Sequence, residues 1–184
     1  MPDNVRVWDL FVRVFHWSLV STVFIALVTE DDFLNLHIVA GYAVGILIIA
    51  RILWGLIGPK YARFSNFIYS PKAVMSYLGD LKNNISARYL GHSPAGGAMI
   101  IVLMITLLLT TISGLSIYAK PGSVFYFFVV QNAFFADIIK DAHEVLAGTL
   151  WVLITLHVAG VIYTSLIHRE NLVRAMITGL KRNN

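Results

Sequence analysis

The chain has 184 residues and a net charge of +4; 58% of its residues are hydrophobic, 13% are charged and none is cysteine. Because soluble domains average about 45–50% apolar and about 25% charged residues, this composition predicts an integral membrane protein. The lack of cysteine excludes disulfides, thiolate metal sites, Cys-ligated iron–sulfur clusters and covalent haem attachment, and the scattered basic residues form no stripe for nucleic acid.

Four apolar segments are long enough to cross a bilayer as helices, which takes about 20 residues. We expect spans at about 8–29, 36–58, 97–118 and 143–167. The first span is the weakest, because its uncharged run begins only at Val14. A cleaved signal peptide is the alternative there, although no small-residue cleavage site precedes the acidic residues that follow.

Basic residues predict the orientation, since cytoplasmic loops carry an excess of Lys and Arg. They cluster before the first span, in loop 59–96 and after the fourth span, whereas loop 119–142 has only Lys120 and Lys140. Both termini and loop 59–96 are therefore expected in the cytoplasm, and loop 119–142 in the periplasm. The predicted outer side carries six acidic residues: Glu30, Asp31, Asp32, Asp137, Asp141 and Glu144.

The connecting segments also carry signals. The Ser-Pro pairs at 70–71 and 93–94 are typical of a helix start, with serine as the cap and proline in the first turn. They predict an interfacial helix over about 70–84 and the start of the third span. We also expect a short amphipathic helix over 170–180 and a re-entrant or interfacial segment over 124–135.

Four histidines lie at matched depths in the predicted spans. His143 and His157 are fourteen residues apart, so they share one helix face and are separated by roughly 21 Å along the axis. One metal cannot bind both. His37 begins the second span on the outer side, and His16 begins the first span on the inner side. Depth therefore predicts two pairs, His16 with His157 and His37 with His143.

Imidazole is a good axial ligand for haem iron, and iron with two histidines has no open position, which suits electron transfer. Gly41 and Gly45 follow His37 on the same face, where small residues let a flat macrocycle approach the backbone. The alternatives are that the histidines only pack or donate hydrogen bonds, and that the glycines form a helix-packing motif.

Arg51 lies fourteen residues after His37, on the same face of the second span. A buried intramembrane arginine normally has a partner, and a haem propionate or a quinone carbonyl would serve. Alternatively, Arg51 extends its charge to the interface. His92 and His168 at the cytoplasmic boundary are expected to be ordinary interfacial residues, with a proton relay at a quinone pocket as the functional alternative.

Several motifs resemble those of the bacterial cytochrome b561 family, which includes the b-type subunits of nickel–iron hydrogenases. They are Val7-Trp8-Asp9-Leu10, Phe15-His16-Trp17, His37-x-x-x-Gly41, Arg51-Ile52-Leu53-Trp54-Gly55, Tyr89-Leu90-Gly91-His92-Ser93-Pro94, Leu156-His157-Val158-Ala159-Gly160 and His168-Arg169-Glu170-Asn171-Leu172. The resemblance covers nearly the whole chain.

The resemblance implies one all-α domain over residues 1–184, a four-helix bundle in the bacterial inner membrane holding two stacked, non-covalent b-type haems. It implies that His16 and His157 bind the inner haem, that His37 and His143 bind the outer one, and that Arg51 lies near the inner haem. Relatives exchange electrons between the quinone pool and a periplasmic redox partner, which we expect here to be a c-type cytochrome.

Three alternatives remain open at this stage. A superoxide oxidase would pass electrons from superoxide to quinone, but six acidic outer residues would repel an anionic substrate. The chain could also anchor a hydrogenase or dehydrogenase as an electron conduit, or be a small haem-free transporter. Whether it is an enzyme is not decided by the sequence, and its expected surroundings are membrane lipid, quinone and redox proteins, with a homodimer left open.

Overall fold

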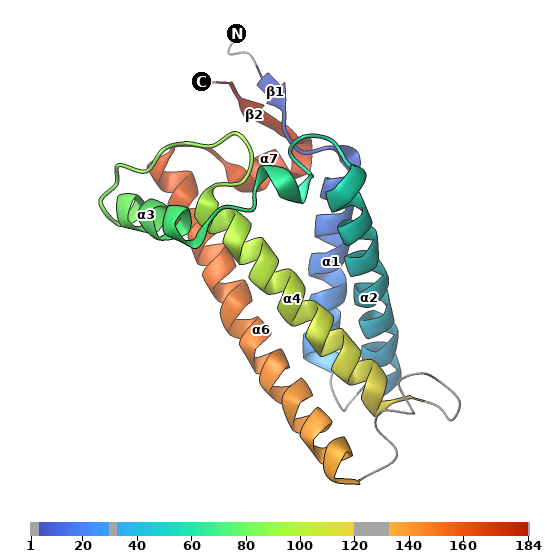
Figure 1. The fold of residues 1–184 in the computed structure, drawn as a ribbon. Coiled ribbons are helices and arrows are strands. Elements are labelled where there is room, and N and C mark those ends of the chain that lie inside the picture. The colour runs from blue at the N-terminus through green and yellow to red at the C-terminus, as the bar shows by residue number, and fades with distance from the viewer. Residues whose placement is uncertain (1–3, 30–32, 120–132, 184) are drawn as a thin grey trace. The chain divides into compact units, whose positions relative to one another are not determined.

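The structure is a computed structural model that describes residues 4–29, 33–119 and 133–183. In chain order the described elements are β1 (Asn4–Arg6), α1 (Leu10–Thr29), α2 (Leu34–Ile57), the short 3-10 helix η1 (Phe64–Asn66), α3 (Pro71–Lys82), α4 (Pro94–Ile117), α6 (Ala133–Ile167), α7 (Leu172–Thr178) and β2 (Leu180–Arg182) (Figure 1). The predicted helical architecture is confirmed, because α1, α2, α4 and α6 are long and apolar enough to cross a membrane.

Several serine and threonine hydroxyls of these long helices donate their hydrogen bonds within their own helix. Thr22, Thr29, Thr110 and Ser165 each donate a hydrogen bond to a backbone carbonyl four residues earlier, at 2.7–2.9 Å. In a bilayer no water is present to satisfy a hydroxyl, so this local bonding is what allows Ser and Thr within an apolar span.

Helix α6 begins at Ala133, well before the predicted span of 143–167. The prediction excluded most of the charged residues at 137–144 from the span, because charge is costly in hydrocarbon. The helix continues through them, and Lys140 and Glu144 lie one turn apart with 4.0 Å between Nζ and Oε1. Glu30, Asp31, Asp32, Lys120 and residues 124–132 of the expected re-entrant segment lie outside the described residues.

Both predicted Ser-Pro helix starts are confirmed. Ser70 caps α3 by accepting a hydrogen bond from the Ala73 amide at 3.3 Å, with Pro71 in the first turn. Ser93 does the same for α4, accepting from the Gly96 amide at 3.2 Å. The serine oxygen replaces a partner that the first amides of a helix otherwise lack.

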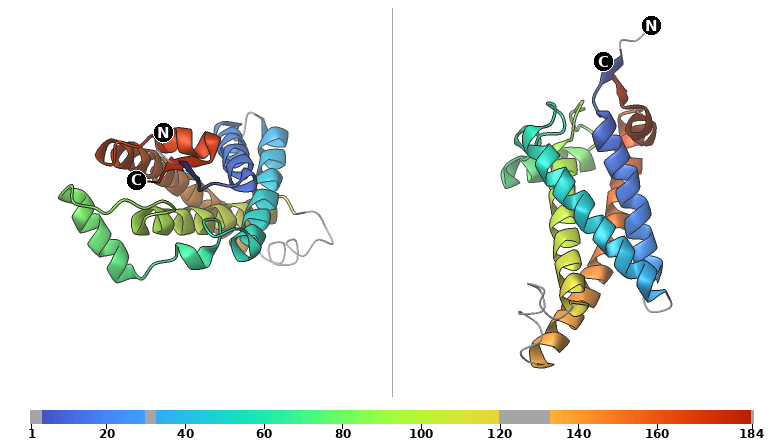
Figure 2. Two further views of the ribbon diagram at one scale, coloured as in Figure 1. Left: turned by 90° about the horizontal axis from the view of Figure 1, so that it is seen from above. Right: turned by 90° about the vertical axis from the view of Figure 1, so that its right-hand side faces the viewer.

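The C-terminal segment differs from the predicted helix over 170–180. Helix α7 ends at Thr178 and is capped by Gly179, whose φ of 81° favours glycine, and a Cβ there would overlap the Trp8 carbonyl oxygen. Residues after this turn form β2, which pairs antiparallel with β1. The two termini therefore lie side by side, as Figure 2 shows. The sequence analysis missed this two-stranded sheet because three-residue strands carry too little pattern.

The described chain divides into two compact units, and each of the four long helices contributes to both. The first unit contains residues 4–16, 50–102 and 154–183, and the second unit contains residues 17–29, 33–49, 103–119 and 133–153. The first unit has an apolar core of Val7, Trp8, Val12, Ala62 and Ala175, against which aromatic residues such as Phe11, Trp54 and Tyr61 pack.

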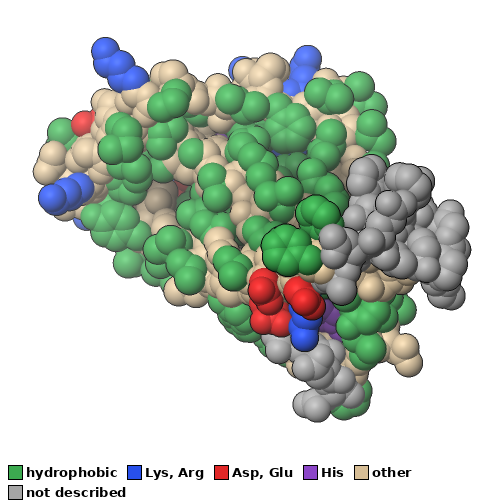
Figure 3. All heavy atoms as spheres, turned by 60° about the horizontal axis from the view of Figure 1, so that its bottom comes forward, with side chains coloured by type: hydrophobic (Ala, Val, Ile, Leu, Met, Phe, Trp, Pro, Cys, Tyr) green, Lys and Arg blue, Asp and Glu red, His purple; other side chains and the backbone are tan. Residues whose placement is uncertain are grey.

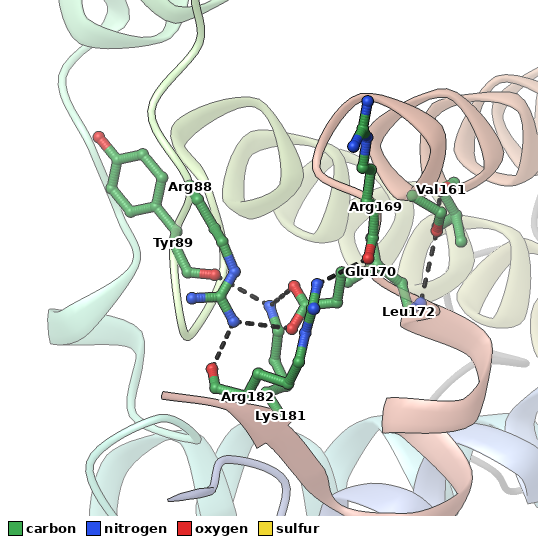
Figure 4. Close-up of polar contacts among 9 residues, drawn as sticks. Arg88, Tyr89, Val161, Arg169, Glu170, Leu172, Lys181 and Arg182 are labelled. Carbon is green, nitrogen blue, oxygen red and sulfur yellow. Dashed lines mark hydrogen bonds and ion pairs between the residues drawn. The ribbon is translucent and has the colours of Figure 1, made fainter. Parts of the chain in front are cut away.

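A buried ionic cluster fixes the C-terminal strand within the first unit (Figure 4). Glu170, whose side chain is 8% exposed, is bonded to Arg88 at 2.8 Å and to Lys181 at 3.1 Å. Lys181 also donates to the Tyr89 carbonyl at 2.9 Å. Burial alone would raise the pKa of the Glu170 carboxyl, but the bonds from Arg88 and Lys181 outweigh it and hold that pKa below its ordinary value.

Candidate functional site

The second unit brings His37 of α2 and His143 of α6 together. Their ring centroids are 6.0 Å apart and their planes are inclined at 76°. Helix periodicity placed each imidazole on an inward face, and the structure gives them a common neighbourhood. Two half-buried histidines from different helices, close together with steeply inclined ring planes, form the first candidate site.

Each of these imidazoles has its Nδ1 engaged by a backbone carbonyl. Nδ1 of His37 lies 2.9 Å from the Ala26 oxygen in α1, and Nδ1 of His143 lies 3.0 Å from the Thr110 oxygen in α4. A carbonyl can only accept, so in both rings Nδ1 carries the proton. The lone pair is consequently on Nε2, which is the nitrogen available to a metal.

The spacing of the pair leaves room for one metal ion that both rings could bind. Two imidazoles that bind one ion with metal–nitrogen bonds of about 2 Å place their ring centroids about 6 Å apart, close to the 6.0 Å between His37 and His143. In the described ranges 4–29, 33–119 and 133–183, no group of three or more His, Asp or Glu side chains could hold a metal. A pair of histidines thus fits a haem iron better than a metal ion that is held by protein side chains alone.

The glycines around this pair differ in their surroundings. A Cβ on Gly41 would meet no atom within 4 Å in the described part of the chain, whereas one on Gly45 would lie 3.1 Å from Cγ2 of Thr111. Gly41 therefore leaves open space one turn from His37, as a flat macrocycle would need, while Gly45 allows α2 to approach α4. The packing alternative from the sequence analysis is favoured for Gly45.

The first unit contains the other two histidines, His16 of α1 and His157 of α6. Both are half-buried, and they lie close enough to interact electrostatically. The structure thus brings together the residues of each pair that matched depth had predicted. That either pair binds haem stays a prediction.

Arg51 is buried in the first unit, with 3% of its surface exposed. One terminal nitrogen, Nη2, donates to the Ala62 carbonyl at 3.1 Å, and the guanidinium lies 5.0 Å from the Phe64 ring centroid. The other terminal nitrogen, Nη1, is buried and has no hydrogen-bond partner among the described residues. The guanidinium does not reach the surface, so the alternative that Arg51 extends to the interface is wrong.

His92 is a second buried donor in the first unit. Its ring lies between Trp8 and Phe67, with a centroid distance of 4.6 Å to each, and its Nδ1 has no partner in the part of the chain that is described. Burial, together with the charges of Arg51 and Lys181, lowers the pKa of His92 to about 3, so the ring is neutral at physiological pH. His92 is therefore not an ordinary interfacial residue.

His168 lies elsewhere, beside the ionic cluster of Glu170. Its Nε2 is 3.4 Å from the Ser86 hydroxyl, and burial lowers its pKa. The structure does not add His168 to the group formed by Arg51 and His92, so a proton relay that includes both boundary histidines has no support.

Sequence reasoning missed several residues that shape these sites. Ser113 contacts His143, and a Cβ on Gly114 would lie 2.9 Å from Cε1 of that ring. Phe64 and Phe67 flank Arg51 from the segment after α2. The adjacent small residues Ser113 and Gly114 could have been a signal, but other small and hydroxyl residues occur in the same span, and aromatic residues in a loop carry no specific signal.

Some residues of the resembling motifs make close contacts within the first unit. Asp9 caps α1, accepting from the Val12 amide at 3.0 Å, and also accepts from the Trp54 indole at 3.3 Å. A Cβ on Gly55 would overlap the Phe64 ring, and one on Gly91 would lie 2.9 Å from Tyr61. These glycines are required by close packing.

Comparison with known families gives one match. The family model for prokaryotic cytochrome b561 matches residues 7–179, a range that contains all four paired histidines, Arg51 and His92. Comparison with curated proteins and with solved structures returned no match.

Proposed function

Because the chain belongs to the prokaryotic cytochrome b561 family, whose members are membrane electron carriers that bind b-type haem, we propose that it holds two such haems. In this proposal the protein carries electrons across the bacterial inner membrane between the quinone pool and a periplasmic redox protein. Four apolar helices of membrane length support a multi-pass arrangement. Each haem, when bound, supplies an iron that accepts and gives up one electron without an open coordination position.

The proposed ligands are His37 with His143 in the second unit and His16 with His157 in the first. The observation that carries the proposal is that His37 and His143 lie close together with Nδ1 of each ring bonded to a backbone carbonyl, which leaves the Nε2 lone pair of each ring available to a metal. A packing histidine has no need for an oriented, unprotonated Nε2. These residues bind and orient the iron, and the helices around them exclude water.

Arg51 and His92 are proposed to bind a polar group that enters the first unit. Each has a buried nitrogen without a partner in the described chain, which is costly unless a ligand accepts from it. Nη1 of Arg51 suits a carboxylate such as a haem propionate, and a neutral His92 suits a quinone carbonyl. Together they support quinone exchange in the first unit.

The second unit carries the surface proposed for a redox partner. Asp137, Asp141 and Glu144 are exposed along one face of α6, in the same part of the helix as His143. Figure 3 shows acidic side chains gathered on a face that is otherwise mainly hydrophobic. Complementary charge steers encounter, so this stripe favours a basic protein such as a c-type cytochrome. The same stripe would repel superoxide, which disfavours the superoxide oxidase alternative.

The basic residues support the proposed orientation. Excess Lys and Arg before α1, between α2 and α4 and after α6 favour a cytoplasmic location for both termini and for the segment between α2 and α4. The stripe on α6 would then face the periplasm, where c-type cytochromes reside. Labelling of single cysteines at position 65 and at position 137 with a membrane-impermeant thiol reagent tests this, and only the second should react in intact cells.

The test of the function is reduction of the purified protein in proteoliposomes. We expect quinol to reduce both haems, and an added basic c-type cytochrome to reoxidise them. No haem reduction by quinol would reject the quinone assignment. Rapid reduction by superoxide generated in a radiolysis pulse, without reduction by quinol, would favour the oxidase instead.

A further inference from the structure

Helix α4 is the long helix that supplies no proposed haem ligand, yet it makes the closest polar contacts to His143. The Thr110 carbonyl oxygen and the Ser113 hydroxyl oxygen each lie 3.0 Å from Nδ1 of His143. Ser113 is also 2.9 Å from the Thr110 oxygen. All three contacts lie within the second unit.

These distances assign the hydrogen atoms. The Thr110 carbonyl can only accept, so it receives both the Nδ1 proton of His143 and the hydroxyl proton of Ser113. A lone pair of Ser113 then faces Nδ1, and the ring proton is shared between two acceptors. Nδ1 of His37, in contrast, meets the single backbone oxygen of Ala26 at 2.9 Å. Its partner cannot be altered by changing a side chain.

Gly114 completes the contact on the same helix. A Cβ at this position would lie 2.9 Å from Cε1 of His143, closer than such atoms approach. The ring therefore lies directly against the backbone of α4, with Ser113 beside Nδ1. Rotation of the imidazole is limited on two sides, and its plane stands at 76° to that of His37.

We infer that Ser113 is a positioning residue that fixes the plane of His143 and strengthens its Nε2 as a ligand. The inference rests on the proposed haem ligation by His37 and His143. An acceptor on the distal N–H of a ligating histidine raises the basicity of the ligand. A more basic ligand stabilises ferric over ferrous iron, so Ser113 lowers the midpoint potential of the haem in the second unit and leaves the other haem unaffected.

The experiment uses the full-length, haem-loaded protein and three variants. Ser113→Ala removes the hydroxyl, and Ser113→Thr keeps a hydroxyl that can reach the same carbonyl. Ser116→Ala is the matched control, because Ser116 lies on the same helix, is buried, and donates only to the Ile112 carbonyl. Midpoint potentials come from redox titration of the visible spectrum, and ligand-plane orientation comes from EPR of the ferric protein.

For S113A we expect a raised midpoint potential for one of the two haems and a shift in the low-spin EPR signal of that haem. In the wild type this signal should be strongly anisotropic, because the planes of His37 and His143 are steeply inclined to each other. S113T and S116A should match the wild type. Unchanged potentials and EPR in S113A, with both haems retained, would overturn the inference alone. If S113A loses a haem, retention by S113T supports the inference and loss by S113T overturns it. A wild-type protein without haem would instead reject the proposed function.

Discussion

The two units each contain a pair of histidines from different helices, but they surround that pair differently. In the second unit the imidazoles of His37 and His143 have backbone carbonyls on Nδ1 and glycines nearby. In the first unit His16 and His157 are accompanied by a buried Arg51 and a half-buried His92, each with one buried nitrogen that has no hydrogen-bond partner among the described residues. The surroundings of the second unit's pair suit binding of a haem iron alone. Those of the first unit's pair also suit binding of a polar group.

This difference matters because a buried donor without a partner costs roughly 1–3 kcal/mol, and more for a charged group. A protein retains such a group where something binds to it. Electron transfer through two haems needs only the four histidines. Arg51 and His92 therefore support the proposal that quinone is bound in the first unit.

The largest expected effect separates the two units by their haems. His143→Ala should remove the haem of the second unit and leave that of the first, reducing haem content by about half. His157→Ala should do the reverse, and His168→Ala is a control that should keep both. Haem content is measured by extraction and by the reduced-minus-oxidised spectrum. Survival of both haems in H143A would show that the pairing is wrong.

The second effect tests the additional donors. Arg51→Gln should slow reduction of the first unit's haem by quinol about 10- to 100-fold, because a hydrogen bond to a charged group contributes about 1.5–3 kcal/mol. The measurement is stopped-flow reduction of the haem. Arg63→Gln is the matched control, since Arg63 is an exposed arginine of the same unit, in the segment that follows α2. Equal slowing in both variants would indicate a general charge effect.

The third effect concerns the ionic cluster of Glu170 with Arg88 and Lys181, which lies in the first unit. Glu170→Gln should lower the free energy of unfolding by about 3 kcal/mol, because it leaves Lys181 buried without its carboxylate. Thermal unfolding followed by tryptophan fluorescence measures this. Asp80→Asn, which makes no ion pair in the described chain, should change little. An unaltered unfolding temperature in E170Q would mean that the cluster is not stabilising.

The smallest effect is the pH dependence of that cluster. The pKa of Glu170 is lower in the folded state than its ordinary value of 4.5, so the folded state binds the proton less tightly than the unfolded one. Its stabilisation is complete above about pH 4.5 and is lost as the pH falls through the folded value. The stability difference between wild type and E170Q should therefore shrink below about pH 4.5. A difference that grows on acidification would contradict the assignment.

Sequence reasoning predicted the long helices, because apolar length is a strong signal and a bilayer restricts spanning structure to few forms. It also paired His16 with His157 and His37 with His143, since the directions of the spans place the members of each pair at matching depth. It could not predict that Ser113 would contact His143, because that contact depends on how α4 and α6 approach each other. The β1–β2 pairing was equally beyond reach, since it joins the two ends of the chain.

The central claim is that the chain binds two b-type haems through two histidine pairs. Its most direct test is the haem-to-protein ratio of the purified wild-type chain, expressed with ample iron and haem precursor. We predict two acid-extractable haems per chain and a visible spectrum of low-spin b type. A colourless protein, or one haem per chain that survives the loss of either pair, would contradict the account.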